Sequence, residues 1–179
     1  MPIRPRVGIS QCLLGDHVRY DGGHKYAPRL IAALHADVDL VAVCPEVEVG
    51  MGTPREPIQL VASSEGARSA NRIVRLRGTS TATDWTERMV AFARTRAAEL
   101  SKLGISGFVL KSRSPSCGPA GVAVLAADAS ISGGTGLFAQ ALMDEMPGVP
   151  IEDEEHLADP AVRAHFVDDV RRYAHRLPR

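Results

Sequence analysis

The sequence has little of what marks several large classes of protein. Only eight residues are aromatic (four Phe, three Tyr and one Trp), and 21 basic side chains balance 21 acidic ones, so the formal net charge is zero. A neutral chain with few aromatic rings lacks the basic surface and the stacking platforms typical of nucleic-acid-binding proteins. No apolar run approaches the roughly 20 residues that span a bilayer, and the N-terminal segment has no secretory core. We therefore expect a cytoplasmic protein with a small-molecule ligand.

Cysteine is also scarce, with three residues at positions 12, 44 and 117. An odd number of cysteines in a reducing compartment argues against disulfides as their purpose. The three lie far apart in the sequence, so no CxxC zinc or redox motif applies and only the fold can bring them together. We expect residues 1–179 to form a single domain, long enough to bury roughly two-thirds of its unfolded surface without a structural metal. A metal in this chain would therefore serve function.

Alternating β-prone and helical segments predict an α/β fold. The order favours a single doubly wound, mostly parallel sheet with helices on both faces. Residues 50–83 are rich in Gly, Pro, Ser, Arg and Thr, and we interpret them as a β-prone insertion, with a hairpin as one arrangement, that covers the site. The predicted strands are Val7 to Ile9, Val38 to Val43, Phe108 to Leu110 and Val122 to Leu125, with β-prone segments at Ile58 to Val61 and Ile73 to Leu76 in the insertion; the predicted helices are Tyr26 to Ala36, Trp85 to Leu103, Thr135 to Asp144 and Pro160 to Arg176.

Each cysteine follows a predicted strand, at the edge of a parallel sheet where ligands bind. Gly and Pro in the surrounding loops expose backbone N–H groups that can hydrogen-bond sulfur. Four thiolates usually close a structural zinc site or an electron-transfer cluster, whereas three leave one metal position open. Cys12, Cys44 and Cys117 therefore fit a catalytic metal site with an open position. The alternative is that each is a small buried apolar residue.

Three further polar residues lie in the same loops. Glu46, two residues after Cys44, is a candidate general base. Ser114 and Ser116 are candidates for orienting substrate or water, and they equally suit capping of the turn around Pro115.

Four cations near the same edge are candidates for binding a substrate carbonyl or phosphate: Arg19, Lys25, Arg55 and Lys111. Of the histidines we keep only His17 and His24 as possible site members. Asp21 with Gly22 is better explained as a turn. The segment from Ser132 to Gly136 precedes a helix and is a weak anion-binding signal, for which a flexible turn and N-cap is the favoured interpretation.

Three segments together resemble a known family: C-L-L-G-D-H-V-R-Y-D-G-G-H-K from Cys12, V-C-P-E-V-E-V-G-M-G-T-P-R from Val43, and L-K-S-R-S-P-S-C-G from Leu110. They resemble the DUF523 family, whose characterised members are thiouracil desulfidases. The later segments G-T-G-L-F-A-Q-A-L and P-G-V-P-I-E-D-E resemble its C-terminal part, so the likeness covers most of the chain. The second motif departs from the family's more glycine-rich pattern at V-E-V-G-M-G.

The resemblance implies a [4Fe-4S] cluster held by the three cysteines, Cys12, Cys44 and Cys117, with the fourth iron free to bind the sulfur of a thiolated pyrimidine. It further implies that Glu46 activates the water that attacks the ring carbon, and that a serine of the S-P-S-C segment, best placed at Ser114, assists. The expected reaction is hydrolytic desulfuration of thiouracil or a thiouridine nucleotide to the oxo base. Iron–sulfur assembly machinery would be the implied protein partner.

Two other functions stay open on the sequence. One is a zinc-dependent hydrolase with three Cys ligands and a water, although the H-x-E and P-C-x-x-C pattern of zinc deaminases is absent. The other is a non-catalytic iron–sulfur sensor or RNA-associated module, which the neutral charge and few aromatic residues disfavour.

Overall fold

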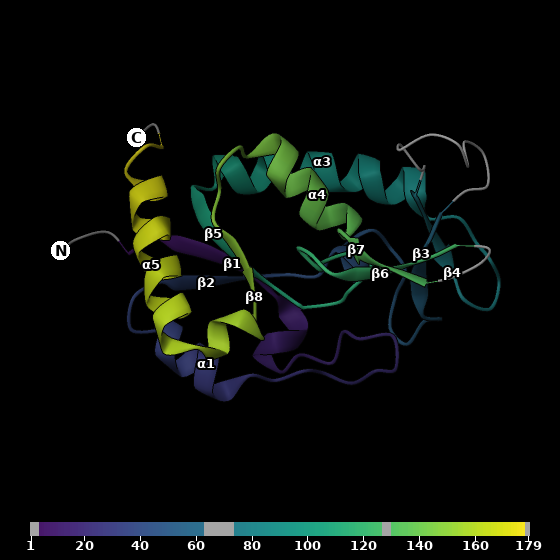
Figure 1. Cartoon of the computed structure of the whole chain (residues 1–179), viewed down its shortest axis with the longest axis horizontal. Helices are drawn as coiled ribbons and strands as arrows, with labels where there is room; N and C mark the ends of the chain where they lie inside the picture. Colours follow the sequence, from purple (N-terminus) through teal and green to yellow (C-terminus); the bar gives the residue numbers. More distant parts are fainter. Residues whose placement is uncertain (1–3, 63–73, 127–129, 178–179) are drawn as a thin grey trace.

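The computed structural model describes residues 4–62, 74–126 and 130–177 (Figure 1). Its first sheet is entirely parallel and has the order β2-β1-β5-β8. The strands are β1 (Arg6–Ser10), β2 (Asp39–Val43), β5 (Ile105–Leu110) and β8 (Ile151–Asp153). The α/β fold with a parallel sheet is thus confirmed.

Helices cover both faces of this sheet (Figure 1). On one face α1 (Pro28–Leu34) and α5 (Pro160–Ala174) pack against apolar residues of β1. On the other, α3 (Thr86–Lys102) and α4 (Leu137–Glu145) pack against β2 and β5. All six residues of β5 are buried, as expected for a strand covered on both sides. Within the described ranges, no helix is long and apolar enough to cross a membrane.

A second sheet was not predicted. It has the order β4-β3-β6-β7, from β3 (Ile58–Ala62), β4 (Val74–Gly78), β6 (Val122–Leu125) and β7 (Ser130–Gly134). The antiparallel β3–β4 pair agrees with the hairpin interpretation of the insertion, while β6 joins β3 in parallel and not the first sheet. Ile73 lies outside the described residues. The turn expected before α4 is in part strand β7, which pairs antiparallel with β6.

Alternating burial explains why β6 belongs in a separate sheet. Val122 and Val124 are buried while the residues between and after them are exposed, the period-two pattern of a strand with one covered face. Its apolar face packs with Leu60 and Leu76 against Met89 of α3. Since the rest of α3 packs on the parallel sheet, this helix joins the two cores.

The strand order places a crevice at the carboxyl ends of the parallel strands. The chain runs from β1 to β2 on one side and later enters β5 on the other side of β1. In open α/β sheets such a change of direction opens a ligand-binding crevice beyond the carboxyl ends of the strands.

Candidate active site

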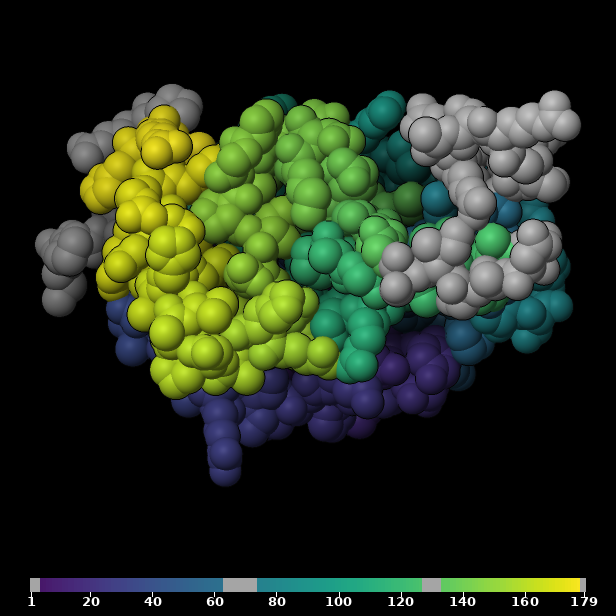
Figure 2. Space-filling model, in the orientation of Figure 1, coloured from purple at the N-terminus to yellow at the C-terminus, as the bar shows by residue number. Residues whose placement is uncertain are grey.

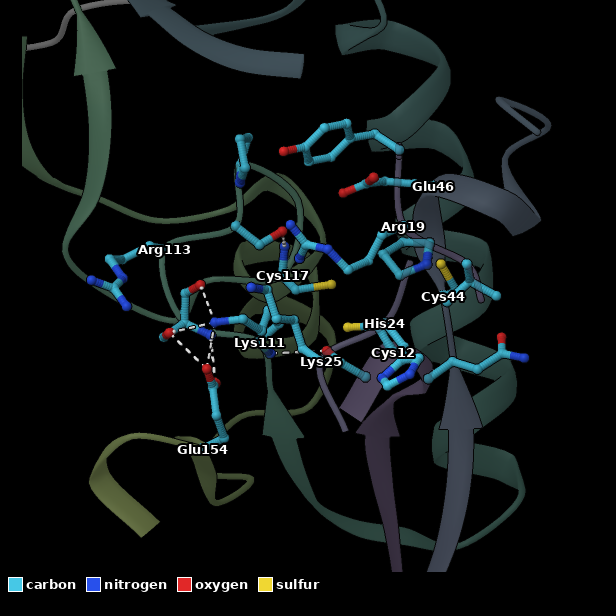
Figure 3. Close-up of a pocket in the computed structure, with 18 of the residues that line it drawn as sticks. Cys12, Arg19, His24, Lys25, Cys44, Glu46, Lys111, Arg113, Cys117 and Glu154 are labelled. Atoms are coloured by element: carbon cyan, nitrogen blue, oxygen red, sulfur yellow. Dashed lines mark hydrogen bonds and ion pairs between the residues drawn. The ribbon is translucent and has the colours of Figure 1, made fainter. Parts of the chain in front are cut away.

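A pocket of about 830 Å³ lies at the carboxyl ends of the parallel strands (Figure 3). It is lined by the loops that follow β1, β2, β5 and β8 and by the segment leading into β3. Cys12, Cys44 and Cys117 all line it, and their sulfur atoms point into the same space. The structure therefore brings together the three cysteines that the sequence placed after three different strands.

A different local structure presents each cysteine. Cys12 lies in a short 3-10 helix, η1 (Gln11–Leu14), that begins where β1 ends, and its carbonyl oxygen accepts the N–H of Lys25 at 2.8 Å. Cys44 is the N-cap of the short helix α2 (Pro45–Glu48), whose first position is the proline. Cys117 lies in the loop after β5, where its N–H donates to Ser114 Oγ at 3.1 Å.

Burial shapes the chemistry of the three thiols. It raises the pKa of Cys12 to about 11 and raises the pKa of Cys117 further still. Burial also raises the pKa of Cys44, although backbone N–H groups of Val47 and Glu46 at the start of α2 favour its thiolate. As free thiols the three would stay protonated at neutral pH, and only a bound cation would hold three thiolates side by side.

The donor set indicates which cations fit. Three sulfur donors suit soft metals such as iron in clusters, zinc or Cu(I). Within the described part of the chain, no three His, Cys, Asp or Glu side chains are close enough to hold one metal ion. A multinuclear cluster needs its cysteines further apart than a single ion does, because each thiolate binds a different iron.

Glu46 faces the pocket from α2 with both carboxylate oxygens engaged. Oε1 accepts the hydroxyl of the fully buried Ser116 at 2.5 Å. Oε2 forms an ion pair with Arg55, whose Nε donates at 3.1 Å. Both members of the ion pair are largely buried, with 15% of the Glu46 side chain and 6% of the Arg55 side chain exposed.

Arg55 holds several parts of the pocket wall together. Its Nη1 donates to the carbonyl oxygens of Val18 at 3.0 Å and Gly52 at 2.7 Å, and its own N–H donates to the carbonyl of Tyr20 at 2.9 Å. The guanidinium predicted to bind substrate is therefore bonded within the protein.

The loop carrying Ser114 to Cys117 packs against the start of α4. The N–H groups of Leu137 and Phe138 donate to the carbonyl oxygens of Pro115 and Ser116, at 3.2 and 2.9 Å. Gly136 permits this contact, because an added Cβ would lie 2.4 Å from the carbonyl oxygen of Ser116. The helix start that was a weak anion-binding candidate thus binds a loop of the chain itself.

Lys111 forms a polar network with the end of β8. Its ammonium pairs with Glu154 and donates to Ser112 Oγ at 2.7 Å, and Glu154 accepts the N–H of Ser112 at 2.7 Å. Burial opposes ionisation of Glu154, but the hydrogen bonds from Lys111 and Ser112 lower its pKa overall. The next residues along, Arg113 and Glu155, form an ion pair on the surface, where the two loops lie side by side (Figure 2).

The remaining predicted residues lie in the loop between η1 and α1. Arg19 and Lys25 line the pocket; Arg19 is 3.8 Å from a carboxylate oxygen of Asp21, and no ion pair of Lys25 occurs within the described residues. His24 lines the pocket, whereas His17, hydrogen-bonded to the carbonyl of Gly22 at 2.8 Å, does not. Asp21 accepts the N–H of Gly23 at 2.9 Å, as expected for a turn residue.

Comparison with known proteins then identifies the family. The family model described as 2-thiouracil desulfurase matches residues 7–154. This chain belongs to the 2-thiouracil desulfurase family. It is similar to a Bacillus subtilis (strain 168) protein named "Uncharacterized protein YbbK", with 34% identity over 110 residues, which is 62% of this chain and 71% of the relative. Among solved structures it is similar to the [4Fe-4S]-dependent thiouracil desulfidase TudS, with a TM-score of 0.68 and 28% identity over 90% of this chain and 99% of that one.

Some pocket residues of this 2-thiouracil desulfurase family member were missed in the sequence. Glu154 carried a signal, since it ends the P-G-V-P-I-E-D-E segment that resembles the family, but a lone carboxylate after a short strand does not reveal its partner. Tyr26 lines the pocket although the sequence assigned it to a helix, which begins two residues later at Pro28. Ser10, at the end of β1, accepts the N–H of Lys111 at 2.9 Å and so links β1 to the loop after β5.

Proposed function

We propose that the chain hydrolyses the C–S bond of a thiolated pyrimidine, thiouracil or a thiouridine nucleotide, and gives the oxo base. The observation that carries the proposal is the meeting of three buried cysteines in one pocket with Glu46. Membership of the 2-thiouracil desulfurase family supports it, as does the similarity to a [4Fe-4S]-dependent thiouracil desulfidase. Cys12, Cys44 and Cys117 would hold a [4Fe-4S] cluster.

The thiol donor set fits such a cluster. All three ligands are soft sulfurs, the chain has no fourth cysteine, and the pocket opens beside them. When bound, the cluster would supply a Lewis-acidic iron with an open position that takes the substrate's sulfur and draws electrons from the C–S bond. Loading would involve iron–sulfur assembly machinery as the protein partner.

Glu46 would act as the general base. It removes a proton from water as the water oxygen bonds to the ring carbon, and that proton returns when the C–S bond breaks. The net reaction is thiopyrimidine plus water to oxopyrimidine plus hydrogen sulfide, without a change of oxidation state. Arg55 orients the carboxylate by fixing Oε2, which leaves Oε1 directed at Ser116.

Ser116 and Ser114 would have different tasks. Ser116 Oγ contacts Glu46 and lies 3.7 Å from Cys117 Sγ, so it can pass a proton between the base and the reacting centre. Ser114 Oγ lies 3.1 Å from Ser116 Oγ and also accepts the Cys117 N–H. Ser114 therefore orients both the relay and the cysteine.

Arg19 and Lys25 are the better candidates for substrate contact among the predicted cations. Both line the pocket, and no ion pair of Lys25 occurs within the described residues, so a substrate carbonyl or phosphate could bind these side chains. Arg55 and Lys111 are bonded to Glu46 and Glu154 and would act mainly by positioning those carboxylates.

An anaerobic assay with the cluster-loaded protein tests the proposal. With 2-thiouracil and 4-thiouracil as substrates, we expect uracil and sulfide in equal amounts from at least one of them. Cys117→Ser, which removes one thiolate, serves as the control and should give neither product. A fully loaded wild-type chain that leaves both thiouracils and their nucleotides unchanged would refute the proposed function.

A further inference from the structure

A carboxylate outside the pocket holds the backbone of Cys44. The N–H of Cys44 donates to Glu48 Oε1 at 2.9 Å, and the N–H of Glu48 donates to the carbonyl oxygen of Cys44 at 2.9 Å. A single residue therefore binds both polar backbone groups of the cysteine. Within the described residues Glu48 does not line the pocket, so it contacts the Cys44 backbone from outside the pocket lining.

The same carboxylate is tied to the long helix α3. Arg96 Nε lies 2.8 Å from Glu48 Oε2, a close ion pair rather than an aligned hydrogen bond. Both side chains are partly buried, with 29% of Glu48 and 22% of Arg96 exposed. The second partner of Arg96 is Glu99 at 3.0 Å, which is more than half exposed.

From these contacts we propose that Glu48 and Arg96 are a positioning pair for Cys44. The inference rests on the proposed function, because it concerns how one cluster ligand is held. Helix α2 has only four residues and is too short to be stable by itself, so the backbone at Cys44 needs an external anchor. Arg96, within a 17-residue helix, provides that anchor through Glu48.

The physical effect is to fix the direction of the Cys44 side chain. A buried N–H without an acceptor costs free energy, so losing the carboxylate would let the Cys44 peptide turn to find another partner. Turning the peptide would move Sγ relative to Cys12 and Cys117. Partners that orient ligands in this way typically change metal affinity by about 10–100-fold when removed.

Iron release measures the effect directly. We would load wild type, Glu48→Leu, Glu48→Gln and Glu99→Leu under anaerobic conditions and follow transfer of iron to a ferrous chelator. Glu48→Leu should release iron on the order of tenfold faster. Glu48→Gln keeps an acceptor oxygen for the Cys44 N–H but loses the charge that pairs with Arg96, so its release rate should lie between those of wild type and Glu48→Leu. Glu99→Leu breaks the other ion pair of Arg96 without touching Cys44, and is the matched control that should also stay near wild type.

Two results would overturn the positioning role. One is a wild-type release rate in Glu48→Leu, and the other is equal acceleration in Glu48→Leu and Glu99→Leu, which would indicate general loosening. If Glu48→Leu does not fold, Arg96→Met removes the anchor while keeping the carboxylate, and it should accelerate release where Glu99→Leu does not.

Failure of the proposed function would look different. A wild-type chain that takes up no iron would refute the proposed [4Fe-4S] cluster. The hydrogen bond between Glu48 and the Cys44 N–H is present without iron. In that event alkylation of Cys44 by iodoacetamide, in chains that carry Cys12→Ser and Cys117→Ser, should be several-fold faster with Glu48→Leu than with Glu99→Leu. Equal alkylation rates would then reject the positioning pair.

Discussion

Ser116 donates a 2.5 Å hydrogen bond to Glu46, although the two residues lie 70 positions apart in the sequence. The contact joins the loop after β5 to helix α2 after β2, and Glu46 lines the pocket of the three cysteines while Ser116 is buried beside it. In the proposed mechanism this hydroxyl gives a proton a path to and from Glu46, whereas Ser114 holds the N–H of Cys117.

Removing the charge of Glu46 should stop turnover without loss of iron. Glu46→Gln keeps the shape and an acceptor oxygen for Ser116, but cannot take a proton from water. We expect kcat to fall roughly 10²–10⁴-fold, the usual contribution of a general base. Iron and sulfide per chain should match wild type, and an unchanged kcat would remove Glu46 from the mechanism.

The two serines should fail in different ways. Ser116→Ala removes the hydroxyl bonded to Glu46, so kcat should fall about tenfold or more while iron is retained. Ser114→Ala leaves the Cys117 N–H without its acceptor, so iron should be released faster. Measuring kcat and iron release on both variants checks the assignment, and identical behaviour of the two would contradict it.

Arg55 should matter for stability as well as for rate. Arg55→Met leaves the buried Glu46 carboxylate without its counter-charge and frees two backbone carbonyls, so the free energy of unfolding should fall by about 3–5 kcal/mol. Arg113→Met breaks the exposed pair with Glu155 and should cost about 1 kcal/mol or less. Urea unfolding of both variants measures the difference, and equal losses would show that the Arg55 pair is not special.

Gly136 should not tolerate a methyl group. In Gly136→Ala the new Cβ would lie 2.4 Å from the Ser116 carbonyl oxygen and 2.8 Å from the Cys117 nitrogen, so the loop or α4 must move. We expect a loss of about 1–3 kcal/mol in unfolding free energy and faster iron release. Gly23→Ala is the control, because the atom nearest its Cβ is an oxygen of the exposed Asp21 carboxylate, at 3.1 Å. A crystal structure of Gly136→Ala in which both the Ser116–Cys117 backbone and the start of α4 are unmoved would refute the steric argument.

The metal-free chain should lose stability at alkaline pH. Burial raises the pKa of Cys12 from 9.0 to about 11, so above pH 9 the unfolded chain releases a proton that the folded chain keeps. The contribution of the Cys12 thiol to the free energy of unfolding is therefore fully present below about pH 9 and is lost as the pH rises toward 11. Urea unfolding of wild type and Cys12→Ser at pH 7.5 and 10.5 tests this, and the decline should be smaller in Cys12→Ser. An equal decline in both would exclude Cys12 as a source.

Local patterns in the sequence predicted the parallel sheet and the location of the three cysteines after its strands. Continuous apolar runs such as Phe108 to Leu110 mark strands covered on both faces, and a cysteine just past a strand of a parallel sheet is expected at the carboxyl end where ligands bind. The expectation of a shared site for Cys12, Cys44 and Cys117 agrees with the pocket that all three line.

Contacts between residues far apart in the sequence could not be predicted from local patterns. The run Val122 to Leu125 marks a strand, but nothing in it says that β6 pairs with β3 in a second sheet. Nothing in the sequence pairs Glu154 with Lys111 or Glu48 with Arg96, and only the fold reveals these ion pairs. The engagement of Arg55 was hidden for the same reason, since charge alone does not tell whether a cation faces a substrate or a carboxylate of the chain.

Counting iron, acid-labile sulfide and zinc per chain after anaerobic reconstitution tests the three-cysteine cluster most directly. We expect about four irons with matching sulfide in wild type, and loss of that content in Cys12→Ser, Cys44→Ser and Cys117→Ser. About one zinc per chain without sulfide, or a full cluster in any of the three serine variants, would contradict a [4Fe-4S] centre held by these residues.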